Sequence, residues 1–211
     1  MRVLPCGADA VLLEFADGAQ ALAYRAGLAA APLTDVVEVV PGARTVLLRA
    51  RNPAAVPGVV AAARGVVPRP LGAVDAPDAP GAGNAGEVTV PVTYDGEDLR
   101  DVADLLGLSP EGVVARHTEL TWTVAFCGFS PGFAYLTSPD AGWVVPRRES
   151  PRTRVPAGSV GLAGEYCGCY PTASPGGWQL IGRTEAPLWD VERDPPALLP
   201  PGTRVRFEAV R

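Results

Sequence analysis

The 211-residue sequence contains no lysine, because all 18 of its basic residues are arginine. This absence excludes a lysine Schiff base and the lysine of a phosphate-binding P-loop. Excess positive charge is lacking too, since the net charge is −5 and the sequence pI is about 4.9. The field of such a protein repels phosphate backbones and anionic membranes. We therefore expect neither a nucleic acid nor a membrane as a partner.

Cysteines and long apolar runs are also scarce. Four cysteines are too few for a disulfide framework in a chain of this size, so reduced thiols and a cytoplasmic location are predicted. Near the N-terminus, Asp9 and Glu14 interrupt the apolar residues of "MRVLPCGADAVLLEF", and neither a signal peptide nor a membrane span is expected. Hydrophobic residues make up 47% of the chain, which is enough for one large core or two small ones.

The first part of the chain, residues 1–71, is predicted to be an α+β domain. Its expected elements are a strand at 11–16, a helix at 19–31, a hairpin of strands at 35–40 and 45–50, and a second helix from about Val56. This order suits a small sandwich of ferredoxin-like type, with the helices on one face of the sheet. Residues 72–86 are crowded with Pro, Gly, Asp and Ala, so they are predicted to form a linker.

The second domain, residues 87–211, is predicted to be mainly β. Alternating valines in "EVTVPVTY", residues 87–94, indicate a half-buried strand. Two short helices are expected next, at 98–107 and 110–118, and Ser109 is a good N-cap for the second. Short β segments divided by glycine and proline follow, at 121–129, 133–137, 142–146, 159–164, 177–184 and 203–210. Many brief strands at close spacing favour a closed or nearly closed β-barrel.

The helical pair around Gly107 allows two interpretations. It resembles a helix-turn-helix, but the residues that would contact DNA are Glu111, Gly112 and Arg116, which are poor contacts in an acidic protein. A packing role is therefore favoured. His117, near the end of the second helix, is either a cation stabilised by the helix dipole or a group that moves or orients a proton.

The segment "CGC", residues 167–169, would place two thiols on one face if it forms a strand. A tetrahedral zinc site needs four ligands, and His117 is the sole histidine of the chain. The simpler interpretation is that Cys167 and Cys169 are small buried hydrophobic residues.

The basic residues cluster in "PRRESPRTRVPAGSVGLAG", residues 146–164. Four arginines lie there: Arg147, Arg148, Arg152 and Arg154. Three prolines stiffen the same segment. Planar guanidinium groups suit a carboxylate, a carbamate or a phosphate, and the glycines around Ser159 can bring backbone N–H groups close to an anion. The alternative is a solvated charged loop or a protein interface.

Two segments, "FCGFSPGFAYL" at 126–136 and "ASPGGWQL" at 173–180, share a Ser-Pro-Gly sequence. In both, proline fits the second position of a type II turn and glycine the third, where φ must be positive. Large aromatic residues flank the two turns and would anchor them on a core: Phe129, Phe133, Tyr135 and Trp178. Such rigid turns either line the mouth of a pocket or form ordinary barrel corners.

Taken together, the motifs "HTELTWTVAFCGFSPGFAYL", "PRRESPRTRVPAGSVGLAG" and "YPTASPGGWQLIGRT" resemble the family that contains the B subunit of 5-oxoprolinase, allophanate hydrolase subunit 1 and the sporulation-kinase inhibitor. The likeness extends through nearly all of the chain, including "VPVTYDGEDLRDVA". It implies a ferredoxin-like N-terminal domain and a cyclophilin-like β-barrel. It also implies a partner subunit of related architecture, the two together resembling the carboxyltransferase component of urea carboxylase.

The function that this resemblance implies is that of the B subunit of an ATP-dependent 5-oxoprolinase. Together with a homologous C subunit and a third subunit, it would help to open 5-oxoproline to L-glutamate, and it would be inactive or weakly active alone. The substrate is then a small carboxylate or amide, and ATP is shared with or bound by the partner subunits. The alternatives are a regulatory inhibitor of a histidine kinase, and a carboxyltransferase component that acts on urea or a related amide with a biotin-dependent partner.

The substrate-binding residues that the resemblance implies are Phe133, Tyr135, Arg147, Arg152, Arg154, Gly158 and Gly177. The arginines would hold a carboxylate or an acyl phosphate, and the backbone at Gly158 and Ser159 would stabilise oxyanion charge. Gln179 would orient the amide, and His117 is a candidate for proton transfer. No metal site is predicted. The chain departs from the family pattern at 166–169, where Tyr-Cys-Gly-Cys replaces the Gln-Thr-Gly-Ile that relatives often carry.

Overall fold

A computed structural model describes residues 1–31, 33–69 and 87–211 of the chain. The chain divides into two compact units, Met1–Pro80 and Gly81–Arg211. The predicted linker, 72–86, lies outside the described residues.

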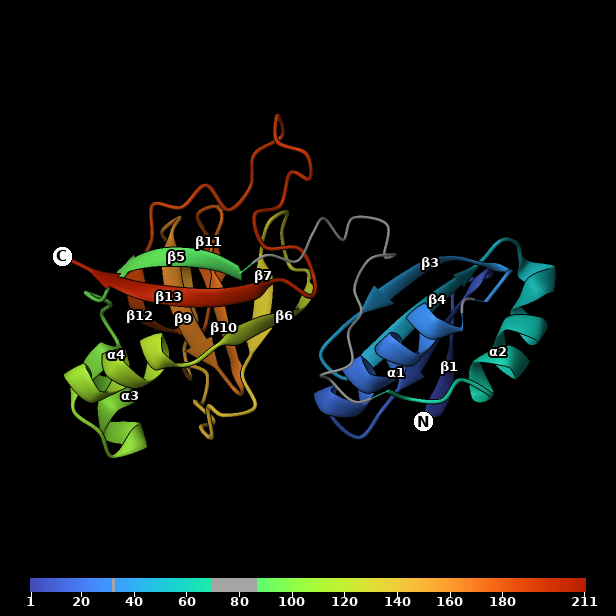
Figure 1. Cartoon of the computed structure of the whole chain (residues 1–211), viewed down its shortest axis with the longest axis horizontal. Coiled ribbons are helices and arrows are strands. Elements are labelled where there is room, and N and C mark those ends of the chain that lie inside the picture. Colours follow the sequence, from blue (N-terminus) through green and yellow to red (C-terminus); the bar gives the residue numbers. More distant parts are fainter. Residues whose placement is uncertain (32, 70–86) are drawn as a thin grey trace. The chain divides into compact units, whose positions relative to one another are not determined.

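The first unit is built on a four-stranded antiparallel sheet in the order β1-β2-β4-β3 (Figure 1). Its elements are β1 (Arg2–Cys6), β2 (Ala10–Glu14), α1 (Gly18–Ala30), β3 (Val36–Pro41), β4 (Thr45–Ala50), the 3-10 helix η1 (Pro53–Ala55) and α2 (Val56–Arg64). Asp17 caps α1 by accepting a hydrogen bond from the Gln20 N–H at 2.8 Å. Strand β1 was not expected from the sequence, because its alternation is short and Pro5 interrupts it.

The core of this unit lies between the sheet and the two helices. Leu13 of β2 and Leu48 of β4 are fully buried, and they belong to one cluster with Tyr24 of α1 and Val59 of α2. The Tyr24 hydroxyl donates to the Ala63 carbonyl at 2.8 Å, so this buried polar group is satisfied. An α+β unit was predicted here, and its ferredoxin-like type stays a prediction.

The second unit contains a closed barrel of seven strands in the order β10-β7-β6-β13-β5-β12-β9 (Figure 1). These strands are β5 (Glu87–Thr93), β6 (Trp122–Cys127), β7 (Ala134–Thr137), β9 (Ser159–Ala163), β10 (Tyr166–Cys169), β12 (Gln179–Arg183) and β13 (Arg204–Val210). The barrel is mixed, because β13 pairs with β5 in parallel while the other pairs are antiparallel. The prediction of a closed β-barrel is therefore confirmed.

Two helices, α3 (Leu99–Leu106) and α4 (Pro110–Glu119), pack against the barrel. Helix α3 ends at Gly107, whose φ of 65° is left-handed, and the Ser109 hydroxyl caps α4 by accepting from the Gly112 N–H. Val102 and Val113 are both fully buried in the core cluster of the barrel. The packing role favoured for this helical pair is thus the one that the structure shows.

The β segments differ from the prediction in two places. Residues 142–146 do not form a strand, because only Val145 makes an isolated bridge, to Gly164. The arginine-rich segment, in contrast, contains a strand, β8 (Arg152–Val155), which pairs with β11 (Ser174–Gly176) in a separate two-stranded sheet. Proline obscured this strand in the sequence, although edge strands of this kind tolerate it.

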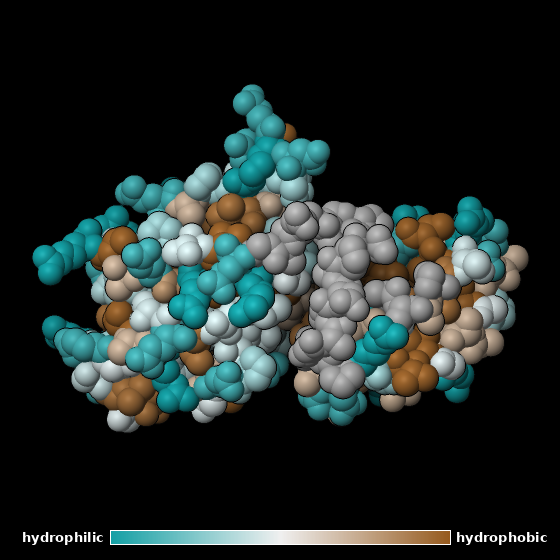
Figure 2. Space-filling view, viewed as in Figure 1, coloured by the Kyte–Doolittle hydropathy of each residue, from teal (hydrophilic) through white to brown (hydrophobic). Residues whose placement is uncertain are grey.

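Strand β10 has two different faces. Cys167 and Cys169 are buried in the core of the barrel, as predicted for small hydrophobic residues, while a Cβ on Gly168 would lie 3.2 Å from the Phe133 ring and 3.0 Å from the Trp178 ring. The barrel wall therefore carries a second apolar cluster on its other side. On the face that Figure 2 shows, the most hydrophobic residues form separate small patches. No helix within the described residues is long and apolar enough to span a membrane.

Candidate functional site

A pocket of about 430 Å³ lies on this second side of the barrel wall. Six aromatic side chains line it: Phe129, Phe133, Tyr135, Tyr166, Tyr170 and Trp178. The loop at 144–147 completes the wall, and among the described lining residues Arg147 alone carries a charge. The pocket therefore offers aromatic ring faces and edges with one guanidinium group, which suits a small anion with an apolar body.

The aromatic wall is held together by edge-to-face contacts around Phe133. This ring is 1% exposed, and its centroid lies 5.1 Å from that of Tyr170 and 5.4 Å from that of Trp178, both nearly perpendicular to it. Tyr135 stacks on Phe126 at 4.3 Å and meets Tyr166 edge-on. Pairs of this kind each contribute about 0.5–1.5 kcal/mol beyond burial, so these contacts stabilise the wall without a ligand.

Arg147 acts electrostatically on the tyrosines of the pocket. Burial raises the pKa of Tyr135, and the charge of Arg147 opposes this. Burial likewise raises the pKa of Tyr170 to about 12, again against the charge of Arg147. Both phenols therefore stay protonated near neutral pH.

The first Ser-Pro-Gly turn has the predicted form and shapes the mouth of the pocket. The Phe133 N–H donates to the Ser130 carbonyl at 3.0 Å, and Gly132 has the positive φ, 81°, that a type II turn requires at its third position. Just before it, the Ser130 N–H donates to the Gly128 carbonyl at 2.8 Å, which closes a γ-turn on Phe129. Phe129 has φ of 70° and is 61% exposed, so a strained residue presents its ring at the pocket mouth.

The second Ser-Pro-Gly segment is not the turn that was predicted. Ser174–Gly176 forms strand β11, and neither Gly176 nor Gly177 is among the described glycines with positive φ. Gly176 is required for a different reason, because a Cβ there would lie 2.5 Å from the Tyr170 hydroxyl. The glycine lets β11 approach the aromatic wall closely.

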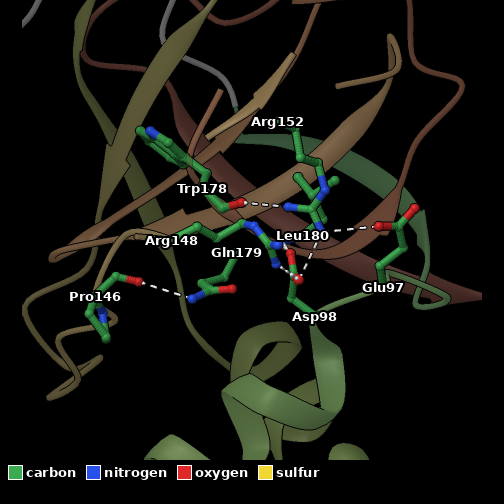
Figure 3. A network of polar contacts seen from close by, with 8 residues as sticks. All are labelled: Glu97, Asp98, Pro146, Arg148, Arg152, Trp178, Gln179 and Leu180. Atoms are coloured by element: carbon green, nitrogen blue, oxygen red, sulfur yellow. Dashed lines mark hydrogen bonds and ion pairs between the residues drawn. The ribbon is translucent and has the colours of Figure 1, made fainter. Parts of the chain in front are cut away.

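A polar network centred on Asp98 lies next to the pocket (Figure 3). Asp98, which precedes α3, is 2% exposed. Its Oδ1 accepts hydrogen bonds from Arg148 Nη1 at 2.7 Å and from Arg152 Nη2 at 2.8 Å, and its Oδ2 accepts one from the Leu180 N–H at 2.7 Å. Burial raises the pKa of Asp98, but these hydrogen bonds and the two positive charges outweigh it, so the pKa lies below its ordinary value.

The same network reaches the pocket wall. Arg152 also donates to Glu97 at 3.0 Å and to the Trp178 carbonyl at 3.4 Å, and Trp178 lines the pocket. Gln179 Nε2 donates to the Pro146 carbonyl at 3.3 Å, and Pro146 lines the pocket too. Asp98 therefore holds both Arg148 and Arg152 by ion pairs within the fold.

This geometry belongs to a barrel domain with known relatives. Residues 1–199 match the family described as carboxyltransferase domain, subdomain C and D. The chain belongs to this family.

Two curated relatives carry the same name. The 5-oxoprolinase B subunit of Escherichia coli O157:H7 is 50% identical over 123 residues, which are 57% of this chain and 56% of that protein. The 5-oxoprolinase B subunit of Bacillus subtilis (strain 168) is 46% identical over 123 residues, 57% of this chain and 51% of that protein. The chain thus aligns with about half the length of these relatives.

Solved structures extend the likeness over both units. TTHA0988 is 34% identical, with a TM-score of 0.72, and the match covers 96% of this chain and 40% of TTHA0988. The urea carboxylase of Kluyveromyces lactis is 18% identical, with a TM-score of 0.68 over 100% of this chain and 23% of that one. At that identity, the second comparison shows that the fold is shared.

The structure brings together four of the residues predicted for the candidate site. Phe133, Tyr135 and Arg147 line the pocket, and a Cβ on Gly177 would lie 3.6 Å from Arg147 Nε. The two Ser-Pro-Gly segments also meet here, because Pro175 and Gly176 line the same pocket as Phe129 and Phe133. The expectation that these segments face one cavity agrees with the geometry.

Other predicted residues lie elsewhere. Arg152 is held by Asp98, and Arg154 is exposed on β8 and is not a lining residue, so the four arginines do not converge on one anion. Gln179 is buried beside the loop that carries Arg147, with its Nε2 on the Pro146 carbonyl. Within the pocket, the arginine cluster therefore supplies a single guanidinium.

The predicted oxyanion-binding backbone at Gly158 and Ser159 needs correction. The Gly158 N–H donates to the Tyr170 carbonyl at 2.7 Å, and the Ser159 N–H donates to the Pro156 carbonyl at 3.3 Å. Both amides are thus occupied within the fold. Gly158, with φ of 80°, is needed because a Cβ would lie 2.3 Å from the Thr184 carbonyl oxygen.

The interpretation of His117 as a cation at a helix end is also wrong. Its side chain is fully buried in the barrel, and burial lowers its pKa to about 3, so the imidazole is neutral. Nδ1 lies 2.7 Å from the Tyr94 hydroxyl, and Nε2 lies 3.2 Å from Cys167 Sγ. His117 is not among the residues that line the pocket.

Sequence reasoning missed three contributors to the site: Asp98, Tyr166 and Tyr170. Asp98 belongs to the acidic run "YDGEDLRD", and nothing in that run shows which carboxylate is buried. Tyr166 and Tyr170 flank "CGC", where strand alternation could have placed Tyr166 opposite the thiols, toward the pocket. Tyr166 is also the first residue of the departure from the family pattern.

Proposed function

We propose that this chain is the B subunit of an ATP-dependent 5-oxoprolinase and that its aromatic pocket binds the 5-oxoproline that is opened to L-glutamate. The names of the curated relatives support the activity. The position of Arg147 among six aromatic side chains supports the pocket as the substrate-binding site. Arg147 would form a bidentate contact with the carboxylate, and the rings would cover the flat lactam.

The charge of the pocket fits this substrate better than its product or urea. In 5-oxoproline the nitrogen is acylated and neutral, so the molecule is an anion without an ammonium group. L-glutamate carries an ammonium that has no carboxylate partner among the described lining residues, and leaving it unpaired is costly. Urea has no charge to pair with Arg147. The pocket would therefore hold the substrate and release the product.

ATP would be handled by the partners, a homologous C subunit and a third 5-oxoprolinase subunit. A magnesium-bound triphosphate calls for several cationic and acidic groups, and Arg147 is the single charged residue among the described residues that line the aromatic pocket. No group of three or more His, Cys, Asp or Glu side chains within the described residues forms a metal site. The chain would accordingly be inactive or weakly active alone.

The test is reconstitution of the complex with its partner subunits and measurement of 5-oxoproline-dependent release of ADP and glutamate. A charge-assisted hydrogen bond contributes about 1.5–3 kcal/mol, so Arg147→Gln should lower kcat/KM by about 10–100-fold. Arg154→Gln is the matched control, because Arg154 is exposed in the same segment and lies outside the pocket lining.

Two outcomes would overturn the assignment. One is an assembled, folded complex that does not turn over 5-oxoproline. The other is equal activity in the Arg147→Gln and wild-type complexes, which would remove the pocket from the reaction. Inhibition of a histidine kinase or biotin-dependent carboxylation of urea by the same preparation would then take precedence.

A further inference from the structure

We propose that Asp98 is a positioning residue that sets Arg147 in the pocket, acting through Arg148 and Arg152. This inference rests on the proposed function, in which Arg147 binds the substrate carboxylate. Asp98 itself is not a lining residue, so its effect on a ligand must pass through other side chains. Figure 3 shows the contacts of Asp98 with Arg148, Arg152 and Leu180, and that of Gln179 with Pro146.

The backbone is fixed on both sides of Arg147. On one side, the Pro146 carbonyl accepts a hydrogen bond from Gln179 Nε2 at 3.3 Å. On the other, the Arg148 N–H donates to the Gly177 carbonyl at 2.8 Å. Both contacts tie the loop to the chain at 177–179, which leads into β12. The Arg147 side chain itself passes Gly177, and a Cβ built on this glycine would lie 3.6 Å from Arg147 Nε, in ordinary van der Waals contact.

Asp98 connects this loop to strand β12. It holds the Arg148 guanidinium at 2.7 Å, while its own N–H donates to the Leu180 carbonyl and its Oδ2 accepts from the Leu180 N–H. The Arg148 side chain must therefore run from a point beside Gly177 to one beside Leu180. One carboxylate thus ties the loop next to Arg147 to the strand that carries the Gln179 anchor.

Arg152 adds a second connection. Its guanidinium, 15% exposed, donates to the same Asp98 oxygen and to the Trp178 carbonyl. Trp178 forms part of the pocket wall, so Asp98 holds the charged loop and the aromatic wall in one register. Catalytic and binding groups lose much of their effect when displaced by about 1 Å, which gives such a support a functional consequence.

The experiment compares Asp98→Asn with Asp95→Asn in the full chain. Asp95 lies three residues earlier and pairs at the surface with Arg183 of β12, the strand whose Leu180 contacts Asp98, so it is a control carboxylate on the same segment. With 5-oxoproline as the probe in calorimetric titration, Asp98→Asn should weaken binding about 10-fold, and Asp95→Asn less than about 2-fold. Arg148→Gln, which cuts one connection at a partly exposed side chain, should weaken binding in the same direction and serves if Asp98→Asn does not fold.

A double-mutant cycle with Arg147→Gln separates positioning from general stabilisation. If Asp98 acts through Arg147, Asp98→Asn should cause no further loss of affinity in the Arg147→Gln background. An equal loss in both backgrounds would overturn the proposal, as would a lowered Tm with unchanged affinity.

A ligand-free readout keeps this test independent of the proposed function. The Nε–Hε relaxation of Arg147, assigned by its loss in the Arg147→Gln spectrum, should show increased side-chain mobility in Asp98→Asn and not in Asp95→Asn. If 5-oxoproline does not bind any variant but Arg147 becomes mobile, the proposed function fails and the positioning role stands. If Arg147 keeps its order in Asp98→Asn, the positioning role is overturned.

Discussion

Some single residues of this chain, such as His117, are polar groups whose burial and protonation state the sequence does not reveal. His117 lies in a cage of Trp122, Trp143 and Phe207, with its two ring nitrogens facing Tyr94 and Cys167. Burial raises the pKa of both of these neighbours, so neither carries charge near neutral pH. A neutral histidine of this kind links helix α4 to strand β10 within the core.

This burial predicts a specific dependence of stability on pH. The folded-state pKa of His117, about 3, lies below the ordinary value of 6.5, so the unfolded chain takes up a proton first as pH falls. The stabilisation is present above pH 6.5 and is lost between pH 6.5 and 3, at about 1.4 kcal/mol per pH unit. The free energy of unfolding, measured with urea between pH 7.5 and 4.5, should fall less steeply with decreasing pH for His117→Gln than for the wild type. Parallel slopes would contradict the buried neutral state.

Two phenylalanines of one loop give a second prediction at this scale. Phe133 is 1% exposed, so Phe133→Ala should lower the free energy of unfolding by about 3–5 kcal/mol. Phe129 is 61% exposed with positive φ, and Phe129→Gly should change it by less than about 1 kcal/mol, because the relieved strain offsets the lost contact. Denaturant unfolding of both variants measures the two changes in the free energy of unfolding. Similar losses in the two variants would mean that Phe129 is a core residue like Phe133.

At the scale of elements, the two Ser-Pro-Gly segments show how far local patterns reach. The segment at 130–133 forms the predicted turn, because Gly132 can adopt the positive φ that the turn requires and a hydrogen bond from the Phe133 N–H to the Ser130 carbonyl closes it. The segment at 174–176 became a strand, because β8 offers it pairing partners and Tyr170 demands a residue without a side chain. The two local sequences are alike, and long-range contacts decided between them.

The close approach of β11 to Tyr170 can be tested by substitution. Gly176→Ala puts a methyl group 2.5 Å from the Tyr170 hydroxyl and should lower stability by about 1–3 kcal/mol. Gly177→Ala is the control, since its Cβ meets nothing closer than 3.6 Å. Adding Tyr170→Phe to Gly176→Ala removes the nearest atom and should restore part of the loss in thermal unfolding. No difference between the two alanine variants would argue against this packing.

At the scale of the whole molecule, the sequence predicted more of the architecture than of the site. Periodicity and the positions of glycine and proline indicated an α+β unit and a closed barrel, since these signals are local. The aromatic members of the pocket were partly predicted, because rings beside rigid turns need a core. The different roles of the arginines were not predicted from the sequence. They depend on Asp98, a carboxylate 49 residues before Arg147, and no local pattern reveals that Asp98 is buried.

The pocket and its supports lie wholly in the second unit, and this leads to a prediction about the entire chain. Every lining residue that the structure describes, together with Asp98, falls between residues 98 and 178 of the unit Gly81–Arg211. That unit has its own core cluster, with Trp122, Leu136 and Phe207 each at most 2% exposed. Residues 81–211 expressed alone should therefore fold cooperatively, with a near-ultraviolet signal from the buried tryptophans, and bind 5-oxoproline within about 3-fold of the full chain. A folded fragment with much weaker binding would show that the first unit contributes to the site, because no other part of the chain would have been removed.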